Sequence, residues 1–336
     1  MPTRYLVTGG CGFIGTRLCA RLVREGARVR VFDNLSVGRR EDLAAVVPVA
    51  TADRAPIAPE AGAPVDLWIG DIRDAADLAR AARGADVVVH LAAHTGVLPS
   101  VEDPRMDCET NVLGTLHALE AARTAGARHF VFASSGAPLG AQTPPIHEDK
   151  LPRPVSPYGA SKLAGEAYCH VYARTYDLAT AVLRFGNVYG PGSWHKGSVV
   201  AKFLRRALAG QPLEVYGDGT QTRDFIHVDD LVDAIVRAAA LDRGGEIFQI
   251  ATGTETTVGE IVEAVRNVLR EHGRDVEVVY TEPRRGEVHR NYADVRKAAK
   301  VLGWRARFGD IEAGIRDTLA AFLEESTPAP GAAQEP

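Results

Sequence analysis

Residues 4–15, Arg4-Tyr5-Leu6-Val7-Thr8-Gly9-Gly10-Cys11-Gly12-Phe13-Ile14-Gly15, decide the fold class of this chain of 336 residues. The apolar start predicts a buried strand, and the glycine-rich turn leads into apolar residues that recur every four positions, as on one face of a helix. Residues 29–32 predict a second strand, which ends at Asp33. Because strand, helix and strand alternate, the strands should be parallel and joined by a right-handed crossover.

The same alternation continues to about residue 186. Further strands are predicted at 65–69, 87–91, 130–133 and 179–185, and helices at 75–82, 105–125 and 157–175. Residues 48–64 hold four prolines and are predicted to form an exposed loop before the third strand. We therefore expect residues 1–186 to form an α/β domain with a doubly wound parallel sheet of the Rossmann type.

Beyond residue 186 the regular alternation stops. A helix at 198–209, a short strand at 213–216 and a helix at 228–241 are predicted among glycine-rich turns. We interpret residues 187–325 mainly as a smaller, mixed α/β lobe that faces the substrate. The low-complexity residues 326–336 are predicted to be a disordered tail.

Composition narrows the possible functions. The chain has 39 Lys and Arg against 43 Asp and Glu, a net charge of −4, which argues against nucleic acid as a partner. Neither a stretch of about 18 apolar residues nor a signal-peptide pattern is present, so no membrane association is predicted. The four cysteines show no C-x-x-C spacing, which indicates free thiols in a reducing cytoplasm, and no metal site is predicted.

The pattern Gly10-x-Gly12-x-x-Gly15 between a strand and a helix is typical of dinucleotide binding. The first glycine allows a tight turn, the second lets a pyrophosphate approach the backbone, and the third lets helix and strand pack closely. The N-terminus of the helix then faces the anion. Asp33, at the end of the second strand, is placed to bind the adenosine ribose hydroxyls. An acid there favours NAD over NADP, while Arg39 and Arg40 keep NADP as the alternative.

Tyr158 and Lys162 lie four residues apart on a predicted helix, so the phenol and the amine share one face. An ordinary tyrosine has a pKa of about 10 and is a poor base at neutral pH, but a nearby ammonium group lowers that pKa. Ser134 and Ser135 end the strand before this helix, where a hydroxyl can bind the same substrate hydroxyl. The group is interpreted as a tyrosine base with supporting residues, and simple turn chemistry is the alternative for the serines.

Together with several other motifs, these residues resemble the extended short-chain dehydrogenases/reductases, specifically the NAD-dependent nucleotide-sugar epimerase/dehydratase family. The resemblance covers about residues 3–325, and the pattern of motifs is similar to that of the UDP-glucose 4-epimerases. The motifs that carry it are residues 8–15, 33–36, 70–72, 90–93, Asn111, 134–135, 158–162, 183–191 and 216–230.

The resemblance implies a bound NAD and the residues around it. The catalytic residues would be Ser135, Tyr158 and Lys162. In the family the tyrosine removes a proton from a sugar hydroxyl, usually at C4, the lysine holds the nicotinamide ribose, and the serine hydrogen-bonds or relays the proton. The cofactor would be bound by Gly9, Gly12, Phe13, Ile14, Gly15, Asp33, Asn34, Ser36, Asp71, Ile72, Leu91, Ala92, Ala93, Asn111, Ser134, Tyr158, Lys162 and Phe185. His90 is expected to be structural.

Two positions separate the reactions of this family. Dehydratases typically carry Asp-Glu directly after the Ser/Thr, and decarboxylases carry Glu at the second position, whereas this chain has Gly136 and Ala137. Neither residue can move a proton, and epimerisation needs no further acid or base. The resemblance therefore implies C4 epimerisation of a nucleotide sugar through a transient 4-keto intermediate. A 4-keto-sugar reductase, a dehydratase and a non-catalytic NAD-sensing protein are the alternatives.

The resemblance places a UDP-sugar on the second lobe: a UDP-hexose, a UDP-N-acetylhexosamine or a UDP-uronic acid. Its binding residues would be Ser135, Asn187, Val199, Tyr216, Arg223, Arg284, Glu287 and Asn291. Asn291 matches a gate position that is Tyr in sugar-restricted epimerases, so it favours room for an N-acetyl group. His195 and Lys196 are candidates to meet a uronic-acid carboxylate. A homodimer paired through helices 105–125 and 157–175 is also implied.

Overall fold

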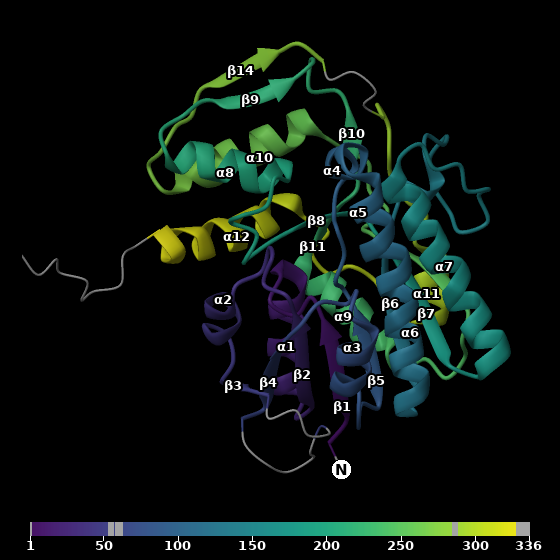
Figure 1. Ribbon diagram of the computed structural model, residues 1–336. Helices are drawn as coiled ribbons and strands as arrows, with labels where there is room; N and C mark the ends of the chain where they lie inside the picture. Colours follow the sequence, from purple (N-terminus) through teal and green to yellow (C-terminus); the bar gives the residue numbers. More distant parts are fainter. Residues whose placement is uncertain (1, 53–56, 58–62, 284–287, 327–336) are drawn as a thin grey trace, which may run out of the picture.

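The chain is built around one large parallel sheet (Figure 1). The computed structural model describes residues 2–52, 57, 63–283 and 288–326. Within these residues the sheet has eight strands in the order β12-β7-β6-β5-β1-β2-β4-β3, each parallel to its neighbours. Their bounds are β1 (Arg4–Thr8), β2 (Arg28–Asp33), β3 (Val49–Thr51), β4 (Val65–Ile69), β5 (Val87–His90), β6 (His129–Ser135), β7 (Ala179–Phe185) and β12 (Glu246–Ile250). The predicted Rossmann-type α/β fold is confirmed.

Helices cover both faces of this sheet. One face buries apolar residues of α1 (Phe13–Arg24), α2 (Arg40–Ala44), α9 (Val228–Ala238) and α11 (Arg296–Val301). The other face buries those of α3 (Ala75–Ala81), α6 (Gly114–Ala125) and α7 (Pro157–Tyr176). The strand order reverses between β1 and β5. In sheets of this kind, ligands bind in the crevice at the carboxyl ends of the strands beside such a reversal.

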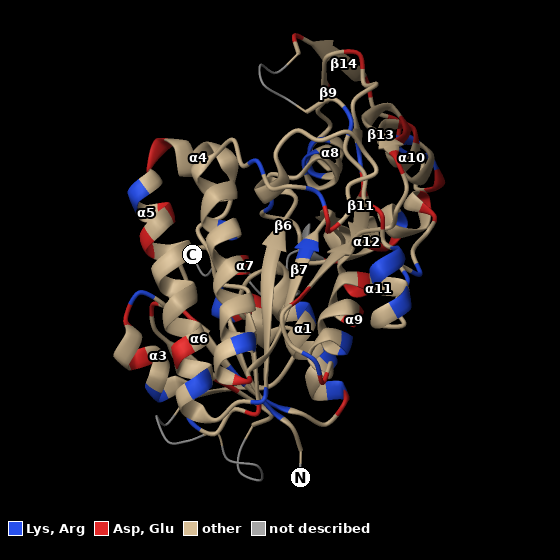
Figure 2. Cartoon of the chain, turned by 90° about the vertical axis from the view of Figure 1, so that its right-hand side faces the viewer, with Lys and Arg blue, Asp and Glu red and all other residues tan. Residues whose placement is uncertain are grey.

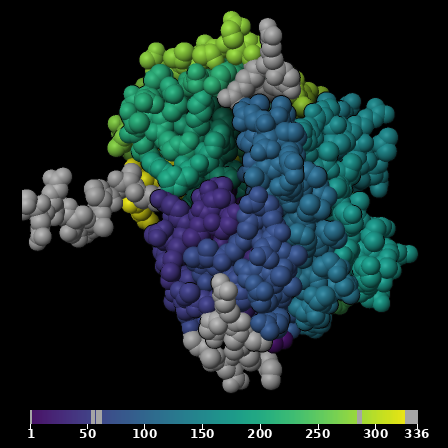
Figure 3. All heavy atoms as spheres, viewed as in Figure 1, coloured from purple at the N-terminus to yellow at the C-terminus, as the bar shows by residue number. Residues whose placement is uncertain are grey.

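A smaller lobe lies beyond the carboxyl ends of the strands, toward which the arrows of β6 and β7 point in Figure 2. It holds β9 (Leu213–Tyr216) paired with β14 (Val278–Thr281), together with α8 (Val199–Leu208), α10 (Val258–Glu271) and α12 (Ile311–Ser326), which share a separate apolar core. Two short pairs complete it: β8 (Asn187–Tyr189) with β11 (Phe225–His227), and β10 (Thr222–Arg223) with β13 (Thr256–Thr257). Figure 3 shows this lobe, teal and green, resting on the purple and blue part of the chain.

The chain crosses between the two parts more than once. α9, β12 and α11 all follow residue 186, yet β12 extends the large sheet beside β7 and both helices pack on it. A strand that ended the sheet at β7 would leave a row of unpaired backbone groups, which β12 satisfies. The interpretation of residues 187–325 as mainly a substrate lobe therefore needs this qualification.

Two predicted elements differ from the structure. Residues 49–51, predicted to be loop, form the edge strand β3 beside β4, because two of the three are β-branched and the edge of β4 offers unpaired backbone groups. The helix predicted at 105–125 is interrupted: α5 (Pro104–Cys108) passes through a π-helical turn at Glu109–Leu113 before α6. Such turns are frequent at functional sites, and this one carries Asn111.

Three short features complete the described chain. α4 (Val97–Glu102) precedes α5, a 3₁₀ turn spans Ala137–Leu139, and α9 ends three residues before the predicted end of its helix. None of the described helices combines the length and the apolar composition that crossing a bilayer requires. The predicted tail at 327–336 lies outside the described residues.

Candidate active site

The glycine-rich loop between β1 and α1 has almost no room for side chains. A Cβ on Gly9, where φ is +70°, would lie 2.7 Å from the backbone nitrogen of Ala92, and a Cβ on Gly15 would lie 2.4 Å from the carbonyl oxygen of Gly9. A Cβ on Gly12 would meet protein only at 3.3 Å. No side chain caps α1, so its first amide groups remain available to bind an anion.

Asp33 lies at the carboxyl end of β2, beside this loop. Its carboxylate accepts hydrogen bonds from the backbone amides of Cys11, at 2.9 Å, and Leu35, at 2.8 Å. Burial raises the pKa of Asp33, and the two amide bonds oppose that rise. The residue is thus held rigidly at the place where an acid would bind ribose hydroxyls.

Asp71 follows β4 and meets the residues after β2. The Asn34 side-chain amide donates to Asp71 Oδ2 at 3.0 Å, and Arg73 forms an ion pair with the same carboxylate at 2.8 Å. The Arg73 guanidinium lowers the pKa of Asp71 to about 2, so this carboxylate is ionised at neutral pH. Ser36 lies in the same turn, where its amide donates to the Asn34 side chain.

Asn111 holds the chain that leaves β5. Its side chain accepts a hydrogen bond from the backbone amide of His94 at 2.8 Å and donates to the His94 carbonyl at 2.9 Å. It also donates to Asp107 Oδ1 at 2.8 Å and to Ser161 Oγ at 3.3 Å. Asn111 therefore shapes the segment that includes Leu91, Ala92 and Ala93 at the cofactor crevice, and its side-chain bonds within the chain were not predictable from the motif.

Ser135, Tyr158 and Lys162 come together at the end of β6. The Ser135 hydroxyl lies near enough to Tyr158 to lower its pKa, and Lys162 Nζ lies 5.9 Å from the centre of the Tyr158 ring. α7, which carries Tyr158 and Lys162, is started by the side chain of Ser156 and by Pro157 at its first turn. The structure thus brings together the three residues that the resemblance names as catalytic.

The pKa of Tyr158 differs from the expectation. Burial raises it, and the hydrogen bond from Ser135 opposes that rise, whereas the sequence suggested a lowering by Lys162. Burial also lowers the pKa of Lys162 to about 8, while the carboxylate of Asp107 acts in the opposite direction. Burial thus disfavours the charged form of both side chains, the phenolate of Tyr158 and the ammonium of Lys162.

His90 is structural, as expected. It is buried between the hydroxyl groups of Thr8, at 2.7 Å, and Thr115, at 3.1 Å. Burial lowers its pKa to about 3, so the ring stays neutral. It helps to hold β1, β5 and α6 together at the floor of the crevice.

Ser134 does not present its hydroxyl to the crevice. Its Oγ donates to Glu166 Oε1 at 2.5 Å, and Glu166 in turn pairs with Arg184. The motifs did not single out Glu166, although a signal existed: it lies four residues after Lys162, on the same helix face as Tyr158 and Lys162.

The two positions that distinguish the reactions, Gly136 and Ala137, directly follow β6. Ala137 lies in the 3₁₀ turn, and a Cβ on Gly136 would meet nothing within 4 Å. Space for an acidic side chain is therefore available at residue 136, yet this chain has no proton-carrying group at either position.

The predicted substrate residues lie around the smaller lobe. Asn187 starts β8 with an exposed side chain, Val199 starts α8, and Arg223 donates to the Val288 carbonyl at 2.8 Å. Asn291 lies next to β10, where its backbone amide donates to the hydroxyl of Thr222 at 3.3 Å. Arg284 and Glu287 fall outside the described residues.

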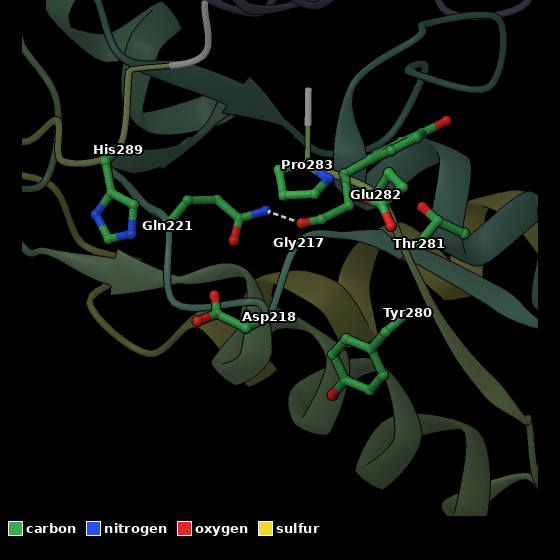
Figure 4. A pocket seen from close by; sticks show the side chains of 9 residues that line it. Gly217, Asp218, Gln221, Tyr280, Thr281, Glu282, Pro283 and His289 are labelled. Atoms are coloured by element: carbon green, nitrogen blue, oxygen red, sulfur yellow. Dashed lines mark hydrogen bonds between the residues drawn. The ribbon is translucent and has the colours of Figure 1, made fainter. Parts of the chain in front are cut away.

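Tyr216 lines a cavity of about 760 Å³ at the carboxyl ends of β9 and β14 (Figure 4). Its other lining residues are Gly217, Asp218, Gln221, Tyr280, Thr281, Glu282, Pro283 and His289. Gln221 is oriented by a hydrogen bond to the Tyr216 carbonyl at 2.8 Å. Aromatic, amide and carbonyl groups in one hollow suit a planar heterocycle with polar edges.

Comparisons with known proteins agree with this geometry. The sequence profile described as the NAD dependent epimerase/dehydratase family matches residues 5–251. The chain is 39% identical over 329 residues to a UDP-glucose 4-epimerase of Mycolicibacterium smegmatis, covering 96% of this chain and 99% of that relative.

Solved structures are similar over nearly the whole chain. The UDP-glucose 4-epimerase of Thermotoga maritima with UDP-glucose has a TM-score of 0.85 at 34% identity, covering 96% of this chain and 99% of that chain. The UDP-glucose 4-epimerase of Thermus thermophilus in complex with NAD has a TM-score of 0.82 at 36% identity, covering 98% and 100%. The chain belongs to the NAD-dependent epimerase/dehydratase family of extended short-chain dehydrogenases/reductases.

Proposed function

We propose that this protein is an NAD-dependent 4-epimerase of a UDP-hexose. The observation that carries the proposal is the group of Ser135, Tyr158 and Lys162 at the carboxyl edge of the sheet, next to two residues, Gly136 and Ala137, that cannot carry protons. The names of the relatives support the same reaction.

The residues of the crevice fit NAD. The glycine-rich loop at residues 9–15 and the uncapped start of α1 would hold the pyrophosphate, and Asp33 would hold the adenosine ribose. A bound NAD would supply reversible hydride transfer at C4 of the sugar, to and from opposite faces of that carbon. No other redox partner is needed for a net epimerisation.

The chain itself must move one proton in each direction. Tyr158 accepts the proton of the C4 hydroxyl as the hydride leaves and returns it when the hydride comes back. Ser135 stabilises the oxygen that changes charge through its hydroxyl, which also lowers the pKa of Tyr158. Lys162, whose Nζ donates to the Ala133 carbonyl at 2.9 Å, would hold the nicotinamide ribose beside Tyr158.

The nucleotide would be bound by the smaller lobe. The cavity beside Tyr216 has the size and lining for uracil, and Arg223 with Asn187 would meet the diphosphate. Arg284 and Glu287 are proposed to contribute a second arginine and a ribose contact. The small side chain of Asn291 favours acceptance of an N-acetylated sugar as well as of UDP-glucose.

The test is turnover by the purified protein. Incubation with UDP-glucose, without added NAD, should give UDP-galactose by NMR, and a Tyr158→Phe variant should lose about 10²–10⁴-fold in kcat, the usual contribution of a positioned acid–base group. UDP-N-acetylglucosamine should be a second substrate. Consumption of added NADH with a 4-keto sugar, in place of epimerisation, would indicate the reductase instead.

We also propose a homodimer formed through the helical edge at α6 and α7. α4, α5, α6 and α7 lie side by side on one edge of the molecule (Figure 2). Several apolar side chains on this edge are exposed: Leu113 by 47%, Val171 by 47% and Tyr168 by 38%. Burial of such residues against a second copy would remove them from water.

A further inference from the structure

Two side chains of helix α7 form hydrogen bonds with successive residues of strand β6. Lys162 Nζ donates to the Ala133 carbonyl at 2.9 Å, and Ser134 Oγ donates to Glu166 Oε1 at 2.5 Å. The next residue of the strand is Ser135. Because Lys162 and Glu166 are one turn apart, the helix that carries Tyr158 holds the strand immediately before the Ser135 hydroxyl.

Glu166 also ties in a third element. Its two oxygens accept hydrogen bonds from Arg184 of β7, at 2.9 Å from Nε and 2.6 Å from Nη2. Both side chains are buried, Glu166 at 3% and Arg184 at 2% exposure. Arg184 is paired in register with Ser134 in the sheet, so a single carboxylate joins α7, β6 and β7 at one level.

This network is not the arrangement that stability alone would favour. A buried ion pair is often no more stabilising than apolar residues of the same volume, because both charges lose water. Two buried donors near it, Arg184 Nη1 and Gln249 Nε2, have no hydrogen-bond partner among the described residues. Gln249 is the register partner of Arg184 on β12. The polar network does fix the relative orientation of α7, β6 and β7, because each hydrogen bond forms only over a narrow range of distances and angles.

We propose that Glu166 is a positioning residue for the epimerase reaction: through Ser134 and Arg184 it sets the end of β6 so that the Ser135 hydroxyl meets Tyr158. This inference rests on the proposed function. Glu166 touches neither substrate nor cofactor in this role. A displacement of the reacting groups by about 1 Å is enough to lower a rate by about 10²-fold, so loss of the hydrogen bond between Ser134 and Glu166 should lower kcat.

The decisive variant is Ser134→Ala, because it removes the link to the catalytic strand and leaves the Glu166–Arg184 pair in place. Ser134→Thr restores a hydroxyl. Asp66→Asn is the matched control, since Asp66 pairs at 2.7 Å with Arg30, another buried arginine of the same sheet, on β4 and β2, away from the active site. For each protein, kcat and KM are measured with UDP-glucose, together with the NAD affinity and the melting temperature.

We expect Ser134→Ala to lower kcat by about tenfold or more, with KM and NAD affinity changed by no more than about twofold. Ser134→Thr should recover most of the rate, and Asp66→Asn should keep it. Glu166→Gln, if it folds, should lower kcat at least as far as Ser134→Ala does.

Two results would overturn the inference. In the first, a folded Ser134→Ala protein has the kcat of the parent. In the second, Ser134→Ala weakens NAD binding and leaves kcat at saturating NAD unchanged. The second would make Ser134 a cofactor ligand instead. Failure of the proposed function is distinguishable, because the parent itself would then not convert UDP-glucose.

Discussion

The two glycines Gly12 and Gly15 should respond very differently to the same added methyl group. A Cβ on Gly15 would lie 2.4–2.8 Å from three backbone atoms of Gly9 and Gly10, so helix or loop must move by about 1 Å to restore ordinary contact. Overpacking of this kind costs about 1–3 kcal/mol. A Cβ on Gly12 meets only the Gly9 carbonyl at 3.3 Å, which a shift of a few tenths of an ångström relieves.

Gly12→Ala should therefore fold almost as stably as the parent and lose NAD affinity by about tenfold or more, about 1.4 kcal/mol, because the methyl group takes the space of the approaching pyrophosphate. Gly15→Ala should lose stability as well as affinity. Gly309→Ala is the matched control, since a Cβ there meets nothing within 4 Å and the residue lies far along the chain from the loop.

Calorimetry with NAD and a denaturant titration on the same three proteins separate the two effects. The reasoning fails if Gly12→Ala binds NAD as tightly as the parent, or if Gly12→Ala and Gly15→Ala are destabilised equally. Either result would mean that the open space above Gly12 is not where the cofactor approaches the backbone.

Three further predictions concern the cofactor, the active-site lysine and the dimer. Asp33→Asn should weaken NAD binding and reduce the preference for NAD over NADP, measured as the ratio of the two Kd values; an unchanged ratio would remove Asp33 from the ribose site. The pKa of Lys162 is lowered to about 8 from 10.5, so activity that needs its charge should fall as the pH rises through about 8. Between about pH 8 and pH 10.5 the Lys162 side chain is protonated in the unfolded chain and has released its proton in the folded chain, so its contribution to the free energy of unfolding should rise with pH. In denaturant titrations, a Lys162→Met variant should lack this rise of stability with pH. Val171→Asp should shift the protein from dimer to monomer in analytical ultracentrifugation, whereas the same change at Val37, which is exposed by 75% in the loop between β2 and α2, should not. A dimer that survives Val171→Asp would exclude this edge as the interface.

Several features were predictable from the sequence because they depend on neighbours along the chain. The strand–glycine turn–helix at residues 4–24 and the Tyr158–Lys162 spacing on α7 are local patterns, and the structure has both. The apolar runs likewise predict most strands of the sheet. The π-helical turn around Asn111 escaped prediction, because the same residues are compatible with an ordinary helix and the extra residue is set by contacts to His94 and Ser161.

By itself, the sequence determined the parallel α/β architecture, the glycine loop for a dinucleotide and the absence of proton-carrying groups at 136 and 137, since each is a matter of residue type and spacing. Only the tertiary structure decided which distant groups share an environment. It placed Arg184 and Ser134 on one carboxylate, returned β12 to the edge of the sheet, and buried Tyr158 so that its pKa rises instead of falling. Burial and long-range pairing depend on how the whole chain packs, and the pKa of a group follows from both.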